Sequence, residues 1–74
     1  MKILTLEIIG ICMAGGDVVV NAKDFSIIDL KGIANTAGRY GVKLCIKNAS
    51  EIPAMSCKGI AMAGGKGTVT FDFS

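Results

Sequence analysis

The chain has 74 residues, enough for one small domain whose single core is only just large enough for stability. Hydrophobic residues make up 51% of it but aromatic residues only 5%, and ten residues are glycine, which favours a core of small and medium aliphatic side chains. The formal net charge of +2 comes from eight basic and six acidic residues scattered along the chain, so no basic run favours nucleic acid or an acidic membrane surface.

The first predicted element is a helix over residues 1–16. Its stripe has the i, i+3, i+4, i+7 spacing of a helix packed on one face, with Ile8, Ile11, Cys12 and Gly15. The apolar segment 3–14 could pass for the core of a signal peptide, but Glu7 interrupts it, and residues 10–16 are nearly copied at 59–65. It is also too short to span a bilayer, so we expect a structural element and no membrane partner.

Two more helices are expected further along the chain. Ser26 is the predicted N-cap of the second, with Phe25 and Leu30 as a hydrophobic staple across the cap. The third helix starts around Pro53, because proline is tolerated in a first turn. Each of the three helices is predicted to stop at a glycine in the left-handed conformation: Gly16, Gly38 and Gly65.

Strands are predicted at 17–22, 42–48 and 68–73, each directly after a helix. Strands separated by a helix must run parallel, and such crossovers are right-handed in nearly all known cases. The fold class is therefore α/β, with three parallel strands, all three helices on one face, and the order α-β-α-β-α-β.

The sequence also repeats itself at an interval of 27 residues. Residues 21–38 align without a gap to 48–65, and Lys31-Gly32-Ile33-Ala34 matches Lys58-Gly59-Ile60-Ala61. A period between about 20 and 50 residues is the mark of a repeat architecture. We therefore predict a single domain over 1–74, built of three tandem helix–strand repeats.

A glycine stands in the middle of each predicted helix, at Gly10, Gly32 and Gly59. Such a glycine costs up to about 1 kcal/mol against alanine. Its recurrence predicts close approach between helices or between helix and sheet, so Gly32→Leu and Gly59→Leu should each destabilise the fold.

The strand pattern Leu44-x-Ile46-x-Asn48 and the helix end Ile60-Ala61-x-Ala63 resemble those of leucine-rich repeats, particularly the kind whose units carry a full helix. The resemblance covers two units and part of a third. It implies a short, curved, right-handed βα repeat and a binding role.

Several patterns that could carry chemistry have a simpler structural interpretation. The segment from Gly59 to Thr68 almost spells a phosphate-binding loop, but it has an extra glycine and joins a helix to a strand instead of the reverse. Asn21 and Asn48 could form a recognition pair, although a ladder that satisfies turn backbone groups is favoured. Asp24 and Glu51 could bind a metal, although complementing a helix dipole is favoured.

An enzyme is not predicted. Three cysteines without CxxC spacing argue against a disulfide framework and predict a reducing, cytoplasmic setting. Lys43 and Lys47 flank Cys45, and nearby cations make a thiol more reactive, but the chain has no histidine to act as a base. We expect no cofactor and no metal.

The function predicted instead is a small non-enzymatic module that binds another protein, as a stand-alone inhibitor or adaptor. One layer of helices leaves one sheet face bare, and repeat proteins use such surfaces for macromolecular partners. The residues expected on that face are Val18, Val20, Lys43, Cys45, Lys47, Thr70 and Asp72. The alternatives are a self-assembling structural protein that forms homo-oligomers through its open last strand at 68–73, and a small enzyme or nucleotide-binding protein.

Overall fold

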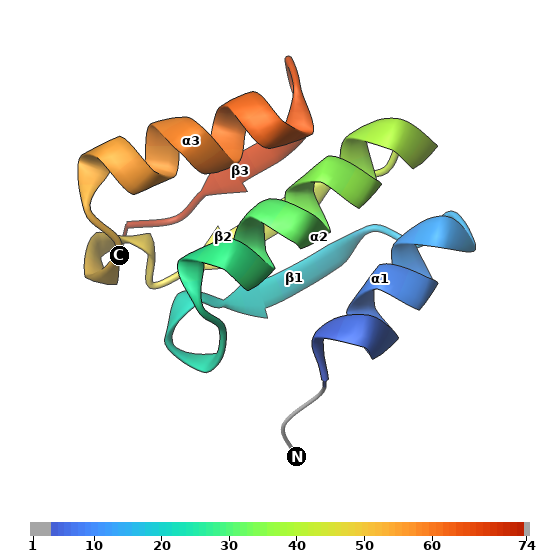
Figure 1. Ribbon diagram of the computed structural model, residues 1–74, viewed down its shortest axis with the longest axis horizontal. Helices are drawn as coiled ribbons and strands as arrows, with labels where there is room; N and C mark the ends of the chain where they lie inside the picture. The colour runs from blue at the N-terminus through green and yellow to red at the C-terminus, as the bar shows by residue number, and fades with distance from the viewer. Residues whose placement is uncertain (1–3, 74) are drawn as a thin grey trace.

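The computed structural model, which describes residues 4–73, contains one parallel sheet of three strands with three helices against one side of it (Figure 1). In chain order the elements are α1 (Thr5–Met13), β1 (Val18–Asn21), η1 (Ala22–Asp24), α2 (Ile27–Tyr40), β2 (Leu44–Lys47), η2 (Ala49–Glu51), α3 (Ala54–Gly64) and β3 (Val69–Phe71). The sheet order is β1-β2-β3, and both pairings are parallel. The predicted α/β class and the alternation of helix and strand are confirmed.

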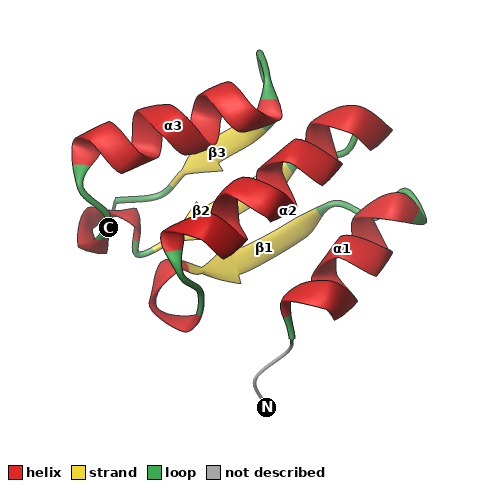
Figure 2. Cartoon of the chain, in the orientation of Figure 1, coloured by secondary structure: helices red, strands yellow, loops and turns green. Residues whose placement is uncertain are grey.

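Short single-turn helices follow the first two strands, as Figure 2 shows. They are the 3₁₀ helices η1 and η2, and each begins with a buried alanine, Ala22 or Ala49. Neither of them was predicted from the sequence. They carry the chain from the end of a strand back over the sheet, to the start of the next helix.

The N-terminus of α2 is formed as predicted. The Ser26 hydroxyl accepts a hydrogen bond from the backbone N–H of Asp29, 3.2 Å away, which satisfies one of the first-turn donors that have no partner within a helix. Phe25 packs against the core and Leu30 is fully buried, as a staple requires. In α1 the Glu7 carboxylate accepts a hydrogen bond from the backbone N–H of Leu4 at 2.9 Å, which gives this acidic residue a structural role.

The predicted helix stops are wrong for the first two helices. Gly38 lies inside α2, which continues to Tyr40 and ends at Gly41 in the left-handed conformation (φ 71°). At the end of α1 the positive φ belongs to Gly15 and not to Gly16. Gly65 does end α3, but with φ 85° and ψ 176° it is not in the left-handed helical region.

The strand register departs from the 27-residue repeat. Val18 pairs with Leu44, 26 residues later, and Leu44 pairs with Val69, 25 residues later. Between β2 and η2 the extra residue is Asn48, which adopts the left-handed conformation (φ 57°) that asparagine tolerates better than most residues. The stretch from the start of α3 to the start of β3 is shorter than the stretch from the start of α2 to the start of β2. In the repeat alignment α3 ends three positions earlier than α2, where three glycines lie within 64–67.

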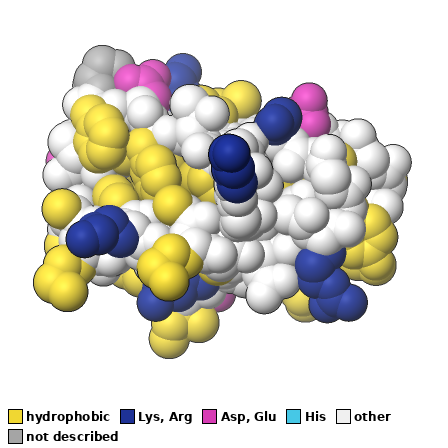
Figure 3. Space-filling view, turned by 90° about the horizontal axis from the view of Figure 1, so that it is seen from above, with side chains coloured by type: hydrophobic (Ala, Val, Ile, Leu, Met, Phe, Trp, Pro, Cys, Tyr) yellow, Lys and Arg dark blue, Asp and Glu magenta, His cyan; other side chains and the backbone are white. Residues whose placement is uncertain are grey.

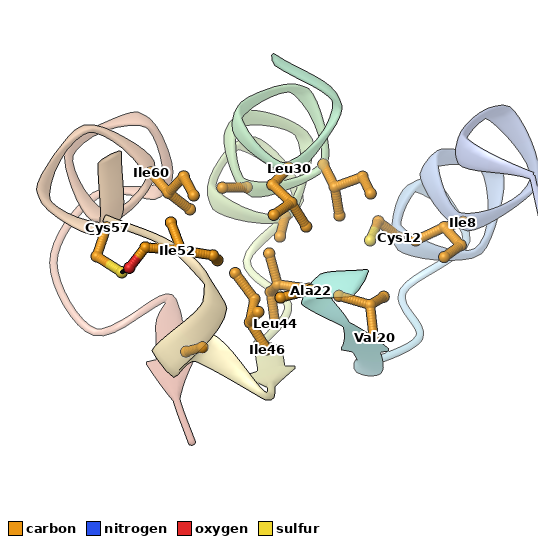
Figure 4. Packing of buried hydrophobic residues seen from close by; sticks show 14 of the residues in the cluster. Ile8, Cys12, Val20, Ala22, Leu30, Leu44, Ile46, Ile52, Cys57 and Ile60 are labelled. Atoms are coloured by element: carbon orange, nitrogen blue, oxygen red, sulfur yellow. Dashed lines mark hydrogen bonds between the residues drawn. The ribbon is translucent and has the colours of Figure 1, made fainter. Parts of the chain in front are cut away.

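The core lies between the sheet and the helix layer, where side chains from both point toward each other (Figure 4). Its fully buried large members come from all three α-helices and from β2, and include Cys12, Leu30, Ile33, Leu44, Ile46 and Ile60. Burying one such aliphatic side chain contributes about 1.5–3 kcal/mol. The predicted helix stripe therefore forms most of the helical half of the core, although Ile11 at the edge is partly exposed.

Close helix approach occurs at a different pair of glycines from those predicted. A β-carbon at Gly38 would overlap the carbonyl oxygen of Gly64, so α2 and α3 touch backbone to backbone there. By contrast, a β-carbon at Gly10 or Gly32 would meet nothing within 4 Å, and at Gly59 only the flexible Lys31 side chain. The close-approach interpretation of Gly10, Gly32 and Gly59 is wrong.

Candidate binding surface on the open sheet face

The side of the sheet away from the helices carries a row of side chains that crosses all three strands. Val19, Cys45 and Thr70 stand opposite one another in the strand register. Val19 is 65% exposed, although it lies in the middle of a strand, because no described element covers this side. We call this surface the outer sheet face; its other members are Asp17, Asn21, Lys43, Lys47 and Asp72, which follow the same alternation along the chain.

Two of the residues expected on this face lie on the other side of the sheet. Val18 pairs with the buried Leu44, and Val20 pairs with the buried Ile46 and is only 5% exposed. Both valines therefore belong to the core, and their placement on the bare face is wrong. The prediction used the 27-residue offset, whereas the strands pair at 26, and a shift of one residue moves a side chain to the opposite face. Val19 takes their place.

A hydrogen-bonded arrangement closes the end of the outer sheet face where the strands begin. The Asp17 carboxylate accepts a hydrogen bond of 2.9 Å from the backbone N–H of Lys43, and the Lys43 ammonium donates one of 2.8 Å to the carbonyl oxygen of Gly67. Lys43 thus ties together the turns that precede all three strands. Asp17 was not predicted from the sequence, where its only signal is its place just before a β-branched run.

Where the strands end, the two asparagines do not form the favoured ladder. The Asn21 side chain accepts a hydrogen bond from the backbone N–H of Lys23 at 2.9 Å, and so caps η1. Asn48 makes no such side-chain cap, and the residue paired with Asn21 is Lys47. Asp72 extends the pairing of β3, since its N–H donates to Ile46 and its carbonyl oxygen accepts from Ala49, both at 2.9 Å.

The three cysteines have free thiols in different surroundings. Cys12 and Cys57 are buried, as expected of small hydrophobic residues, and the Cys57 sulfur lies 3.9 Å from the carbonyl oxygen of Ile52 (Figure 4). Cys45 is partly exposed at the centre of the outer sheet face. Burial raises the pKa of the Cys12 thiol, and the negative charge of Asp17 raises this pKa further.

The raised pKa of Cys12 predicts a loss of stability in alkaline solution. Above about pH 8.5, the ordinary pKa of a cysteine, the unfolded chain releases the Cys12 proton while the folded chain keeps it. The stabilising contribution is therefore complete below that pH and is lost as the pH rises through the folded pKa. Urea unfolding of the wild-type chain and of Cys12→Ala between about pH 7 and pH 10 should show the larger decrease in the wild type. Parallel pH profiles would contradict the assignment.

The glycine-rich end of the segment that resembles a phosphate-binding loop and the two acidic candidates all lie in connections between the α-helices and the strands. The glycine-rich segment 64–68 leads from the end of α3 into β3, so no helix begins there to face a phosphate. Asp24 and Glu51 are exposed residues of η1 and η2. Residues 4–73 form no pocket and hold no cluster of three or more histidine, cysteine, aspartate or glutamate residues placed to bind a metal.

No helix within residues 4–73 combines the length and the apolar character that a membrane-spanning segment needs. Comparison of the chain with protein-family models, with curated proteins and with solved structures finds no match.

Proposed function

We propose that the protein is a non-enzymatic module that binds another protein through its outer sheet face. The observation that carries this proposal is the row of exposed Val19, partly exposed Cys45 and exposed Thr70 on a sheet whose helices all lie on the opposite side. Exposed β-branched side chains on a flat sheet surface form contact area with little loss of side-chain freedom. Such a module would act as a stand-alone inhibitor or adaptor.

We also propose that the three helix–strand units form a short right-handed repeat of the leucine-rich-repeat kind. The 27-residue repeat supports this, because its equivalent residues Ala22 and Ala49 are both buried at the start of a 3₁₀ helix. The burial of equivalent helix positions supports it as well, since Ile33 matches Ile60 in sequence and in burial. Repeat proteins bind macromolecular partners across composite surfaces of this type.

The lysines beside the central row of the outer sheet face support a partner that makes polar contacts around a less polar centre. Lys47 is exposed beside the central row, whereas the Lys43 ammonium is already bonded to the Gly67 carbonyl oxygen. Lys43→Glu would therefore disturb the turn before β3 as well as the surface. For this reason Val19 and Lys47 are better probes of binding than Lys43.

The proposal predicts that Val19→Glu combined with Lys47→Glu abolishes partner binding without unfolding the chain. Both residues are exposed, and exposed changes usually alter stability by no more than about 0.5 kcal/mol. The test captures proteins from an extract of the producing cells on the immobilised wild-type chain, and identifies them by mass spectrometry. A protein held by the wild type should be lost from the double variant. Alkylation of Cys45 by a maleimide should also slow when that protein is bound.

The matched control is Ile28→Glu, which places the same charge on the far side of the molecule, where Ile28 is 81% exposed on α2. It should keep the captured protein. Loss of that protein with Ile28→Glu but not with the double variant would assign binding to the helix layer. An unchanged rate of Cys45 alkylation in the complex would likewise exclude the outer sheet face.

A further inference from the structure

The two ends of the helix layer are less buried than equivalent positions in its middle. Ile33 and Ile60 are fully buried, whereas Ile11, the equivalent residue of the first unit, is 41% exposed. At the other end Ala34 is fully buried and its carbonyl oxygen lies against Gly64 of α3, whereas its equivalent Ala61 is partly exposed. Each end therefore has the side chains of an interior contact without the neighbouring unit that would cover them.

The two edges of the sheet are open in a corresponding way. Thr68 and Asp72 use their backbone groups to bond β2, so the alternation of a parallel ladder directs those of Val69 and Phe71 to the free edge. On the other edge Val18 bonds β2, and Val19 directs its backbone groups outward. Unpaired edges of this kind are templates for pairing with another chain.

The surfaces beside these edges are apolar and differ in charge. Figure 3 faces the α3 and β3 edge, where hydrophobic side chains gather on one half, and Phe71 and Phe73 stack with ring centroids 6.1 Å apart. At the opposite end Leu4, the residue just before α1, is exposed in addition to Ile11. Residues 4–22 carry two acidic and no basic residues, whereas residues 54–73 carry two lysines and one aspartate.

We propose that a second copy of this chain continues the stack, with α3 and β3 of one copy against α1 and β1 of the next. The interior contact between α2 and α3 is the template, since Lys31 lies over Gly59 there. The equivalent Lys58 would lie over Gly10 of the next copy, one turn from Glu7, and a β-carbon at Gly10 now faces open space. This contact uses the ends and not the outer sheet face, so it stands independently of the proposed function.

From the sequence, the strand at 68–73 was expected to pair with another copy of the chain, without a stated surface on that copy. The partner surface inferred here is the α1 and β1 end. Because the two contacting surfaces differ, the contact is head-to-tail and does not close at a dimer, unless the rotation between copies closes a ring. The average mass of the wild-type chain should therefore rise with concentration beyond that of two chains of 7.6 kDa.

Two variants that each block one end provide the test. Ile11→Glu charges the α1 end and Ala61→Glu charges the α3 end, and sedimentation velocity measures the mass. Each variant alone should stay monomeric at concentrations where the wild type associates. An equimolar mixture should form one dimer and nothing larger, because one intact end remains on each partner. Ile28→Glu and Met62→Glu are the controls, since both residues are exposed on the outer side of the helices, and should associate like the wild type.

The outcomes separate this proposal from its competitors. A wild-type chain that stays monomeric, or a mixture that stays monomeric, would overturn it. Association that survives Ile11→Glu but is lost with Ala61→Glu would show that two β3 edges pair with each other instead. Association lost in Ile28→Glu would place the contact on the helix layer.

A second measurement does not depend on how well the charged variants fold. Gly10→Cys and Lys58→Cys are made in separate chains that also carry Cys45→Ser, and a short bismaleimide is added to the mixture. Cross-linked dimers should form when the two variants are mixed, and should not form when either variant is treated by itself. An equal yield with Ile28→Cys in place of Gly10→Cys would mean that the cross-link reports random collision, and would overturn the proposal.

Discussion

Gly38→Ala should destabilise the protein by about 1–3 kcal/mol, the usual cost of overpacking a tightly packed contact. The added methyl group would overlap the carbonyl oxygen of Gly64, a backbone atom that cannot rotate away as a side chain can. The helices α2 and α3 would have to separate along their contact. For a domain of this size each kcal/mol lowers the melting temperature by about 4–8 °C, so thermal unfolding measures the effect directly.

Gly32→Ala is the matched control for Gly38→Ala, because both glycines lie inside α2. A β-carbon at Gly32 meets nothing within 4 Å, and alanine is the better helix former by up to about 1 kcal/mol. This variant should therefore melt at a higher temperature than the wild type. Shifts of the same sign in the two variants would show that helix propensity, and not the approach of the two backbones, decides the stability at both positions.

Leu30→Ala should destabilise by about 2–5 kcal/mol, the range observed when a fully buried leucine is truncated. Leu30 is 0% exposed on the middle helix, so helices on both sides and the sheet beneath it prevent the cavity from collapsing. A small domain has a free energy of unfolding toward the lower end of about 5–15 kcal/mol. We therefore expect a variant that loses a large part of its free energy of unfolding, which urea titration of its circular dichroism measures.

The control for this truncation is Ile28→Ala, two residues away on the opposite side of α2. Ile28 is 81% exposed, so its truncation should change the free energy of unfolding by no more than about 0.5 kcal/mol. A comparable loss in both variants would mean that the outer side of the helix layer is also covered in solution. That result would contradict the end-to-end stacking that we propose, in which Ile28 stays uncovered, and a loss that depends on protein concentration would show that another copy covers it.

Local patterns in the sequence were sufficient for the order and type of the three α-helices and three strands, although not for the two 3₁₀ helices. The apolar stripe that contains Leu30 and Ile33 predicted a helix buried on one face, and the Ser26 cap predicted where that helix begins. Helices that separate short strands predicted parallel pairing, because an antiparallel return needs only a tight turn. These features depend on neighbours within a few residues, so they can be read from one chain.

The side of the sheet on which each strand residue lies was decided only by the tertiary structure. The run Val18-Val19-Val20 has no alternation from which to choose a face, and the repeat aligned Val18 with Cys45 when the true partner of Cys45 is Val19. One extra residue, Asn48, and an early end to α3 changed the count of residues between strands. Since side chains in a strand alternate with a period of two, each single-residue difference moves a side chain to the opposite face.

Which glycines lie at a contact between helices was likewise decided only by the tertiary structure. The sequence predicted a close approach at Gly32 and a helix stop at Gly38, but only the packing of α2 beside α3 brings Gly38 against Gly64 and leaves Gly32 open. A repeated sequence determines which positions are equivalent along the chain. Which of them touch depends on how the helices pack and on whether a neighbouring unit is present, and both are properties of the assembled layers.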